Sequence, residues 1–564
     1  MKAHFKILII ISFLNVSFCA SAQNVTFTKV WEKVYGGFDH DQSDNAHLMY
    51  LDNDSNIVVA LTAVSNVSGN KLSPNCQGLV PLSPDMWLIK LDQNGNKIFD
   101  QSYGSSRDEG VKDFLMLNDG SMLLAGLSNS PVECFKSQGH YGSWLDNDIW
   151  VIKVDSAGFK IWDKRFGTTA SDALNSIVAT PDSGFILTGY GYSSTTGNLA
   201  GLSHGSTDIR VFKIDKNGNI VWHNLYGGDG TESPGLIIRT SSGNYLIAGI
   251  THTSIASGNI SQDNLGGPTS VKMDNWIIRI DEGGALLWER RYGCPLDDSG
   301  GAPLENSKGE IVVASHIKGS CAGGDATDTM DRGQADIWIF ALDSATGNIL
   351  YDKRIGGNKN EWVTQLLQTS DGGYLLACIS TSDAGFDKSE PKWDVSGAGG
   401  DFWIVKTDSL FNIQWDKTIG GTWNEKIPHI IMINDSTLIL GGTSDSFIGG
   451  DKTVAKFDTA GGAGGDLWIM KYTTSSITGI NELSQPQFSI YPNPVKDVLY
   501  VSPKKRLQAN MVINVMDMQG RIIKEEKISN SNGSVIPINV SALSQGVYLL
   551  RMNGQVQRFV KIVP

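Results

Sequence analysis

The sequence has few charged side chains, and basic residues are the scarcer kind. Asp, Glu, Lys and Arg make up 19% of the 564 residues, with 46 basic against 59 acidic side chains and a formal net charge of −13. Nucleic-acid-binding proteins usually carry an excess of positive charge, so this balance argues against a nucleic-acid partner. No apolar run of about 18 residues follows the first 22 residues, so no transmembrane anchor is expected in the remaining chain.

Glycine is the abundant residue. It accounts for 63 of the 564 residues, about 11% compared with a typical 7%. Together with the low charge content, this composition is typical of an ordered, turn-rich protein and favours an all-β fold.

The first 22 residues have the pattern of a secretory signal peptide. Lys2 and Lys6 precede an apolar run from Ile7 to Leu14, and Ala20-Ser21-Ala22 forms a small-residue cleavage site. An alternative is a lipoprotein signal ending at Cys19, but it would place the bulky Phe18 directly before the modified cysteine. We therefore expect residues 1–22 to be removed and the mature chain to be exported.

The remaining chain is dominated by an internal repeat. A segment of the form Asp-x-Trp recurs seven times at intervals of 60 to 66 residues, with Arg210 in place of Trp once. The segments begin at Asp85, Asp148, Asp208, Asp274, Asp336, Asp401 and Asp466. Each unit contains four strand-sized runs separated by turn residues, which is the pattern of a four-stranded propeller blade.

These repeats predict a seven-bladed β-propeller over residues 23–472. The chain enters the repeat at the strand of Trp31 and leaves it after the strand of Trp468, so these two strands are expected to complete one blade and hide the sheet edges. The units resemble bacterial propeller repeats of the form Asp-x-Trp-x-x-Lys-x-Asp-x-x-Gly-x-x-x-Trp over roughly residues 29–472. That resemblance implies an architecture and no activity. Variation in length falls almost wholly in one loop, so one face carries long variable loops, as a binding face does.

A Ser/Thr-rich linker over residues 473–487 leads to a different unit over residues 488–564. The sequence features that define this unit are Tyr491, Pro492, Asn493, Pro494, Gly520, Gly546 and Tyr548. With these features the unit resembles the C-terminal sorting domain, type A, of proteins exported by the type IX secretion system of Bacteroidetes-type bacteria. The resemblance implies a small β-sandwich that the export machinery recognises, and a protein that is attached to the cell surface or released.

Seven acidic residues occupy equivalent positions in the loops of the variable face. They are Asp44, Glu109, Asp172, Glu232, Asp298, Glu361 and Glu425. Clustered carboxylates could bind calcium or a cationic partner, and calcium is the one metal that we consider; no other cofactor is expected. The alternative is that each carboxylate accepts backbone N–H bonds of its own loop, and repetition in every unit favours this second interpretation.

The exported chain has five cysteines, so at least one is left unpaired. Cys294 and Cys321 fall in two loops of one unit on the same face, and Cys76 and Cys134 fall in long loops of neighbouring units. We expect disulfides Cys76–Cys134 and Cys294–Cys321, with Cys378 as a free, buried thiol.

These features predict an exported, non-catalytic propeller that binds a glycan or a protein through its long-loop face. One alternative is an extracellular polysaccharide hydrolase or lyase, which would require catalytic residues that depart from the repeat. The other is a structural protein of a surface layer. The sequence does not name the ligand.

Overall fold

A computed structural model describes residues 25–38, 41–42, 49–76, 83–267, 269, 272–395, 397, 399–457, 465–475, 488–503, 511–516, 522–528, 535–552 and 555–562. The predicted signal peptide, Asp44, most of the predicted linker and Gly520 lie outside these residues. The chain divides into two compact units, Met1–Gly479 and Ile480–Pro564. Every regular element of the described residues is a strand, so the all-β prediction is confirmed.

Strands β1 to β29 form seven antiparallel sheets, here called sheets I to VII. Sheet I comprises β2 (Asp41–Gln42), β3 (Met49–Leu51), β4 (Ile57–Ala63), β5 (Asp85–Leu91) and β6 (Lys97–Tyr103). Sheet II comprises β7 (Glu109–Met116), β8 (Met122–Ser128), β9 (Asp148–Val154) and β10 (Lys160–Phe166). Sheet III comprises β11 (Asp172–Ala179), β12 (Phe185–Tyr192), β13 (Thr207–Ile214) and β14 (Ile220–Tyr226). Sheet IV comprises β15 (Glu232–Arg239), β16 (Tyr245–Thr251), β17 (Asp274–Ile280) and β18 (Leu286–Tyr292).

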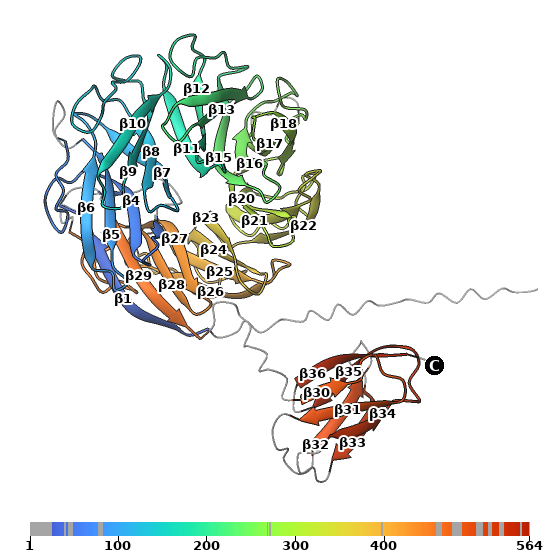
Figure 1. Cartoon of the computed structure of the whole chain (residues 1–564). Coiled ribbons are helices and arrows are strands. Elements are labelled where there is room, and N and C mark those ends of the chain that lie inside the picture. The colour runs from blue at the N-terminus through green and yellow to red at the C-terminus, as the bar shows by residue number, and fades with distance from the viewer. Residues whose placement is uncertain are drawn as a thin grey trace, which may run out of the picture. The chain divides into compact units, whose positions relative to one another are not determined.

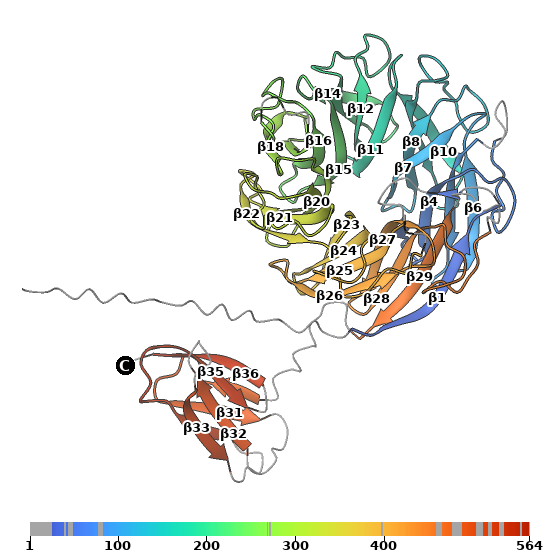
Figure 2. The same cartoon turned by 180° about the vertical axis from the view of Figure 1, so that it is seen from behind.

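The other three sheets repeat this order. Sheet V comprises β19 (Ser299–Glu305), β20 (Ile311–Lys318), β21 (Ala335–Leu342) and β22 (Ile349–Ile355). Sheet VI comprises β23 (Glu361–Gln368), β24 (Tyr374–Ser380), β25 (Asp401–Thr407) and β26 (Ile413–Ile419). Sheet VII comprises β27 (Glu425–Asn434), β28 (Thr437–Ser444), β29 (Asp466–Thr474) and β1 (Phe27–Tyr35). The sheets are arranged in a ring, with β7, β11, β15, β23 and β27 near its centre (Figures 1 and 2). This arrangement is that of a β-propeller.

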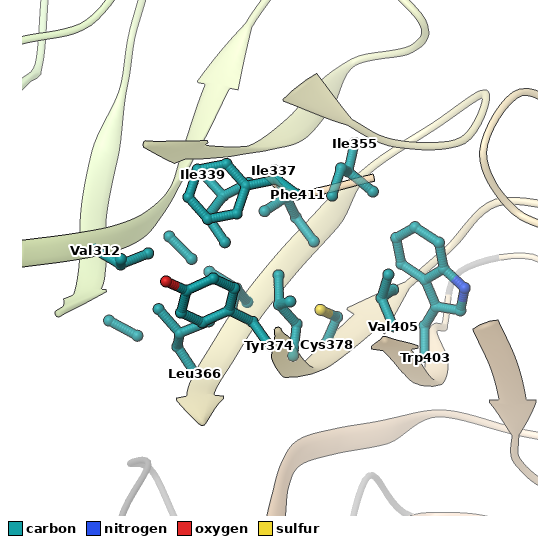
Figure 3. Close-up of a cluster of buried hydrophobic side chains, with 14 of the residues drawn as sticks. Val312, Ile337, Ile339, Ile355, Leu366, Tyr374, Cys378, Trp403, Val405 and Phe411 are labelled. Carbon is teal, nitrogen blue, oxygen red and sulfur yellow. The ribbon is translucent and has the colours of Figure 1, made fainter. Parts of the chain in front are cut away.

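Large apolar side chains pack between neighbouring sheets. The Asp-x-Trp strands are buried along their whole length or nearly so, and Trp87, Trp150, Trp276, Trp338, Trp403 and Trp468 are fully buried. Figure 3 shows one such core between sheets V and VI, where Ile339, Tyr374 and Trp403 surround Cys378. Burial of this apolar surface is the main force that holds one sheet against the next.

Short hairpins connect the Asp-x-Trp strands to the outer strands. In the hairpin after β9, Asp155 Oδ1 accepts the N–H groups of Ala157 and Phe159, both at 2.9 Å. Gly158 follows with a φ of 87°, a conformation that costs glycine least. Asp155 therefore stabilises the turn of this hairpin.

The two ends of the repeat meet in sheet VII. β1 pairs antiparallel with β29, and Trp31 lies opposite Lys471. The expected closure is therefore confirmed, and β29 extends to Thr474, two residues beyond the predicted boundary at 472. An N-terminal strand thus completes a sheet whose other three strands come from residues 425–474.

The second unit consists of two antiparallel sheets. One contains β30 (Phe488–Tyr491), β31 (Val498–Pro503) and β34 (Ile536–Asn539), and the other contains β32 (Met511–Met516), β33 (Ile522–Ile528), β35 (Gly546–Met552) and β36 (Gln555–Lys561). Their shared core includes Phe488, Leu499, Ile513, Ile538 and Phe559. The unit is therefore the expected β-sandwich.

We predict that closure by β29 is essential for a stable propeller. A chain that ends at Gly465 lacks the buried residues Trp468, Ile469 and Met470, whereas a chain that ends at Gly479 keeps them. Loss of one large core side chain costs about 2–5 kcal/mol, so loss of three, about 6–15 kcal/mol, is as large as the ~5–15 kcal/mol that usually stabilises a protein. Thermal unfolding followed by circular dichroism should show a cooperative transition only for the longer chain. Equal unfolding temperatures would contradict the prediction.

Candidate functional site

The long loops and the loops between sheets lie on one face of the propeller, here called the long-loop face. Backbone hydrogen bonds join the two kinds of loop, for example from Phe135 N to Gly104 O at 3.2 Å and from Asp451 N to Gly420 O at 2.8 Å. The short hairpins lie at the opposite ends of the strands, because neighbouring strands are antiparallel.

The repeated carboxylates predicted as binding-face candidates are buried at the start of the inner strands. Glu109, Asp172, Glu232, Asp298, Glu361 and Glu425 are each at most 1% exposed. One oxygen of each accepts the N–H group four residues earlier, at 2.6 to 3.1 Å. The described carboxylates therefore cap their own loops, which is the second of the two interpretations given above. Asp44 is the seventh member of the set and lies outside the described residues.

The second carboxylate oxygen usually bonds hydroxyl groups of the adjacent strand. Glu361 Oε1 accepts hydrogen bonds from Ser380 Oγ at 2.8 Å and from Ser382 Oγ at 2.5 Å. Burial raises the pKa of Glu109 and Glu232 above the usual range. These carboxylates thus fasten the loops to the sheets and present no exposed oxygen to a ligand.

A second set of aspartates caps the long loops. Asp85 Oδ2 accepts the Cys76 N–H at 2.7 Å, and Asp274 Oδ2 accepts the Leu265 N–H at 3.1 Å. The Asp-x-Trp aspartates are therefore bonded to backbone groups on the same face as the first set. Two buried carboxylates per sheet create a concentration of negative charge that is costly without a cation.

Each sheet also buries a basic side chain on this face. These residues are Lys71, Lys136, Arg210, Arg291, Arg354, Lys388 and Lys452, which are at most 3% exposed. Lys452 Nζ donates to Ser444 Oγ at 2.9 Å and to Ser446 O at 2.8 Å, and burial lowers its pKa. In sheet V, Arg354 Nε contacts Asp336 Oδ2 at 2.5 Å instead.

The cation comes from two different places in the fold. In sheets I, II, VI and VII a lysine follows the residue whose N–H group bonds the neighbouring loop. In sheets III, IV and V the residue that follows is apolar, namely Ala200, Ile260 and Ala326. These three sheets supply an arginine from a strand, and Arg291 Nη1 lies 3.2 Å from Asp274 Oδ2. The position of the basic residue in the repeat therefore varies between sheets, whereas every sheet retains one buried basic side chain.

Exposed tryptophans are unevenly distributed over the long-loop face. Four tryptophans are exposed, namely Trp144 (55%), Trp362 (37%), Trp393 (46%) and Trp423 (42%). Trp362 is the second residue of β23, Trp393 lies in the long loop of sheet VI, and Trp423 lies in the loop that leads to β27. Three of the four therefore belong to the junction of sheets VI and VII. Our sequence interpretation missed them, although comparison of equivalent repeat positions could have found Trp362 and Trp423.

Two arrangements that could suggest hydrolytic chemistry are structural in their contacts. Gly201-Leu-Ser-His-Gly205 has the spacing of a nucleophile elbow, but it lies between strands of one sheet, and Ser203 Oγ bonds Ser193 Oγ at 3.0 Å. His316 Nε2 accepts the Val363 N–H at 3.1 Å, so Nδ1 carries the proton and donates to Ser299 Oγ at 2.7 Å. Ser299 is therefore not activated by this histidine.

In the described residues, no group of three or more His, Cys, Asp or Glu side chains could hold a metal ion. The calcium interpretation of the repeated carboxylates thus has no candidate cluster within this part of the chain.

Two disulfides join loops of the long-loop face. Cys76 is bonded to Cys134, which links the long loops of sheets I and II, and Cys294 is bonded to Cys321. Cys378 is free and buried, and burial raises the pKa of its thiol. Neither disulfide lies at the junction that carries the three tryptophans.

In the second unit, the Tyr491-Pro-Asn-Pro494 segment lies at the end of β30. The Tyr491 ring stacks on Tyr500 with centroids 5.7 Å apart, and Asn493 Oδ1 accepts the Val560 N–H at 2.8 Å. Tyr548 OH donates to Ser544 O at 2.9 Å. These contacts connect the first and last strands of the sandwich.

Comparison with known proteins identifies this second unit. Residues 489–563 match the family model of the secretion system C-terminal sorting domain. The type IX sorting domain indicates export to the cell surface or beyond and handling by the secretion machinery. No helix within the described ranges has the length and apolar character needed to cross a membrane.

No curated protein matches the chain. Among solved structures, a protein of unknown function from Dyadobacter fermentans has a TM-score of 0.39 and 10% identity, covering 79% of this chain and 99% of its own. An ulvan lyase described as a new family of polysaccharide lyase has a TM-score of 0.44 and 12% identity, with coverages of 75% and 97%. The Pan2 WD40 domain of Neurospora crassa has a TM-score of 0.40 and 9% identity, with coverages of 79% and 95%.

We predict that Asp298 makes stability depend on pH. Its Oδ1 has no hydrogen-bond partner among the described residues, and burial raises its pKa to about 9. The folded state therefore keeps a proton that the unfolded state loses above about pH 4, so this residue lowers stability as pH rises from 4 to 9. Asp298→Asn should gain at least about 1 kcal/mol more stability at pH 8.5 than at pH 5, measured by urea unfolding. Asp54→Asn, at an exposed site, serves as control, and an equal gain for Asp298→Asn at both pH values would contradict the assignment.

Proposed function

We propose that this protein is an exported, non-catalytic propeller that binds a glycan or a protein through its long-loop face. The observation that carries the proposal is the group of exposed tryptophans at one junction of an otherwise repetitive face. Exposed aromatic surface that departs from a repeat is typical of a binding site on a rigid scaffold.

The buried loop caps support a binding role over an enzymatic one. A glycan hydrolase needs a carboxylic acid and a carboxylate beside the scissile bond, and a lyase needs a base within hydrogen-bond reach of the substrate. The six described acids of the repeated set are buried and bonded to their own loops. Catalysis by this set would require the loops to come apart.

We expect the full-length exported protein to retain polysaccharides without altering them. Affinity gel electrophoresis against a panel of soluble polysaccharides measures retention, and a panel of outer-membrane proteins covers the protein alternative. Reducing-end assays and absorbance of unsaturated sugars measure cleavage in the same samples. Release of either product would replace the proposal with the hydrolase or lyase alternative. Self-association without retention of any ligand would favour a surface-layer role.

We also predict that export depends on the second unit. Deletion of residues 488–564 removes the segment that matches the sorting domain and leaves the propeller sheets intact. In a bacterium with a type IX system, the truncated protein should accumulate in the periplasm, as measured by cell fractionation and immunoblotting. The matched control carries Trp144→Ala and keeps the sorting domain. Normal surface delivery of the truncated protein would contradict the prediction.

A further inference from the structure

The three tryptophans of the junction between sheets VI and VII lie on elements that contact one another. Val395 N, two residues after Trp393, donates to Thr422 O at 3.3 Å, and Trp423 N donates to Ser446 Oγ at 2.9 Å. A Cβ atom added to Gly450 would come within 3.0 Å of Trp393 Cγ, so this indole lies against the long loop of sheet VII.

Trp362 faces the same junction. In the strand register Trp362 lies opposite Ile379, which lies opposite Phe402, and cross-strand partners project from the same face of a sheet. Phe402 stacks on Trp468 of sheet VII with ring centroids 5.9 Å apart. The Trp362 face of sheet VI is therefore turned toward sheet VII, beside the loop of Trp423. Figure 1 shows β23 to β29 next to one another in this part of the ring.

The other described junctions lack aromatic groups at the positions of Trp362 and Trp423. The positions equivalent to Trp362 are occupied by Gly110, Ala173, Ser233, Ser299 and Lys426. The positions equivalent to Trp423 are occupied by Arg107, Ala170, Gly230, Leu296 and Lys359. Trp393 has an aromatic equivalent, because Phe457 lies against Gly69 as Trp393 lies against Gly450. A core function would place aromatic residues at every junction, so Trp362 and Trp423 serve something outside the repeat.

The charges around the junction are already balanced. Lys426 Nζ lies 3.0 Å from Asp445 Oδ2, Lys417 Nζ lies 2.8 Å from Glu390 Oε1, and Lys392 Nζ lies 2.9 Å from Asp394 Oδ2. Paired cations attract an anionic polymer weakly, and the chain as a whole carries a net charge of −13. These charges disfavour a sulfated or uronic-acid polysaccharide and favour an uncharged one.

Polar residues flank Trp423 in the sequence, while exposed Val395 and Ile448 lie in the long loops of sheets VI and VII. Thr422 and Asn424 flank Trp423, and Asn424 Oδ1 accepts the Gly400 N–H at 2.9 Å. A protein partner usually buries a continuous apolar centre, whereas a sugar ring presents an apolar C–H face and a rim of hydroxyl groups. Indole faces carry partial negative charge and attract the polarised C–H groups of such a ring.

From these observations we propose that Trp362, Trp393 and Trp423 form a sugar-stacking subsite for a neutral polysaccharide at the junction of sheets VI and VII. This inference rests on the proposed binding function of the long-loop face and names its ligand class and its place. The loops are fixed by hydrogen bonds before the ligand arrives, so little conformational entropy is lost on binding.

The test compares alanine variants of the full-length protein. Mixed-linkage β-glucan, galactomannan and starch are the neutral probes, and alginate and polygalacturonate are the anionic ones, all in affinity gel electrophoresis. Wild-type protein should be retarded by at least one neutral probe. Trp362→Ala, Trp393→Ala and Trp423→Ala should each weaken that retardation about 10-fold, which corresponds to about 1.4 kcal/mol. Trp144→Ala, an exposed tryptophan of sheet II, should bind as the wild type does.

Unfolding temperatures of all variants establish whether the propeller remains folded. Trp423→Ala is the most informative variant, because its indole lies in an exposed loop and its loss should disturb the fold least. A variant that carries all three substitutions completes the series. If it binds as the wild type does, the subsite is overturned and the proposed function still stands. Retardation by the anionic probes alone would overturn the neutral ligand class. Binding of outer-membrane proteins with no glycan bound would overturn the subsite in favour of the protein alternative. Absence of every kind of ligand would overturn the proposed function itself.

Discussion

The long-loop face depends on buried carboxylates that bond backbone N–H groups of its loops. A buried N–H without a partner costs about 1–3 kcal/mol, and the loops of this face, which have up to 22 residues between strands, contain many such groups. The acid at the start of each described inner strand from β7 onward and the acid of the Asp-x-Trp strand accept hydrogen bonds from these groups. This solution places ionisable groups in a site that water does not reach, and the rest of the face must compensate for their burial.

The compensation explains why the repeat is strict at some positions and loose at others. The acids must stand where the loop N–H groups converge, so their positions recur in every unit. A cation only has to reach the same pocket, and a loop lysine such as Lys388 does so as well as a strand arginine such as Arg354. Contacts between inner strands are also adjusted in pairs. Between sheets III and IV, Ser176 Oγ accepts the Ile237 N–H. At the equivalent positions of sheets IV and V, Leu236 has no acceptor and Pro303 has no N–H group.

The architecture could be predicted because it follows from periodicity. Strand period, turn residues and the phase of Trp31 relative to Trp468 are all local patterns, and they led to the propeller and its closure. The cysteine pairs could be predicted because topology brings few loops within reach of one another. The role of Glu361 could not be decided in this way, because an acid that binds a ligand and an acid that caps a loop have the same sequence spacing. Only its contacts with Gly357 N, Ser380 and Ser382 distinguish the two.

The tryptophans escaped prediction for a related reason, since exposure is a tertiary property and Trp is a usual core residue in this repeat. Their neighbours show how the structural network and the proposed binding site are connected. Trp362 directly follows the capping Glu361, Trp423 lies inside the loop that Glu425 caps, and the backbone N–H of Trp393 donates to Asp401. The Trp393 backbone is thus bonded directly to a buried carboxylate, whereas Trp362 and Trp423 lie beside residues that cap their loops. The same acids that stabilise the loops therefore fix the backbone that carries the exposed indoles, and a ligand meets loops that are already in place.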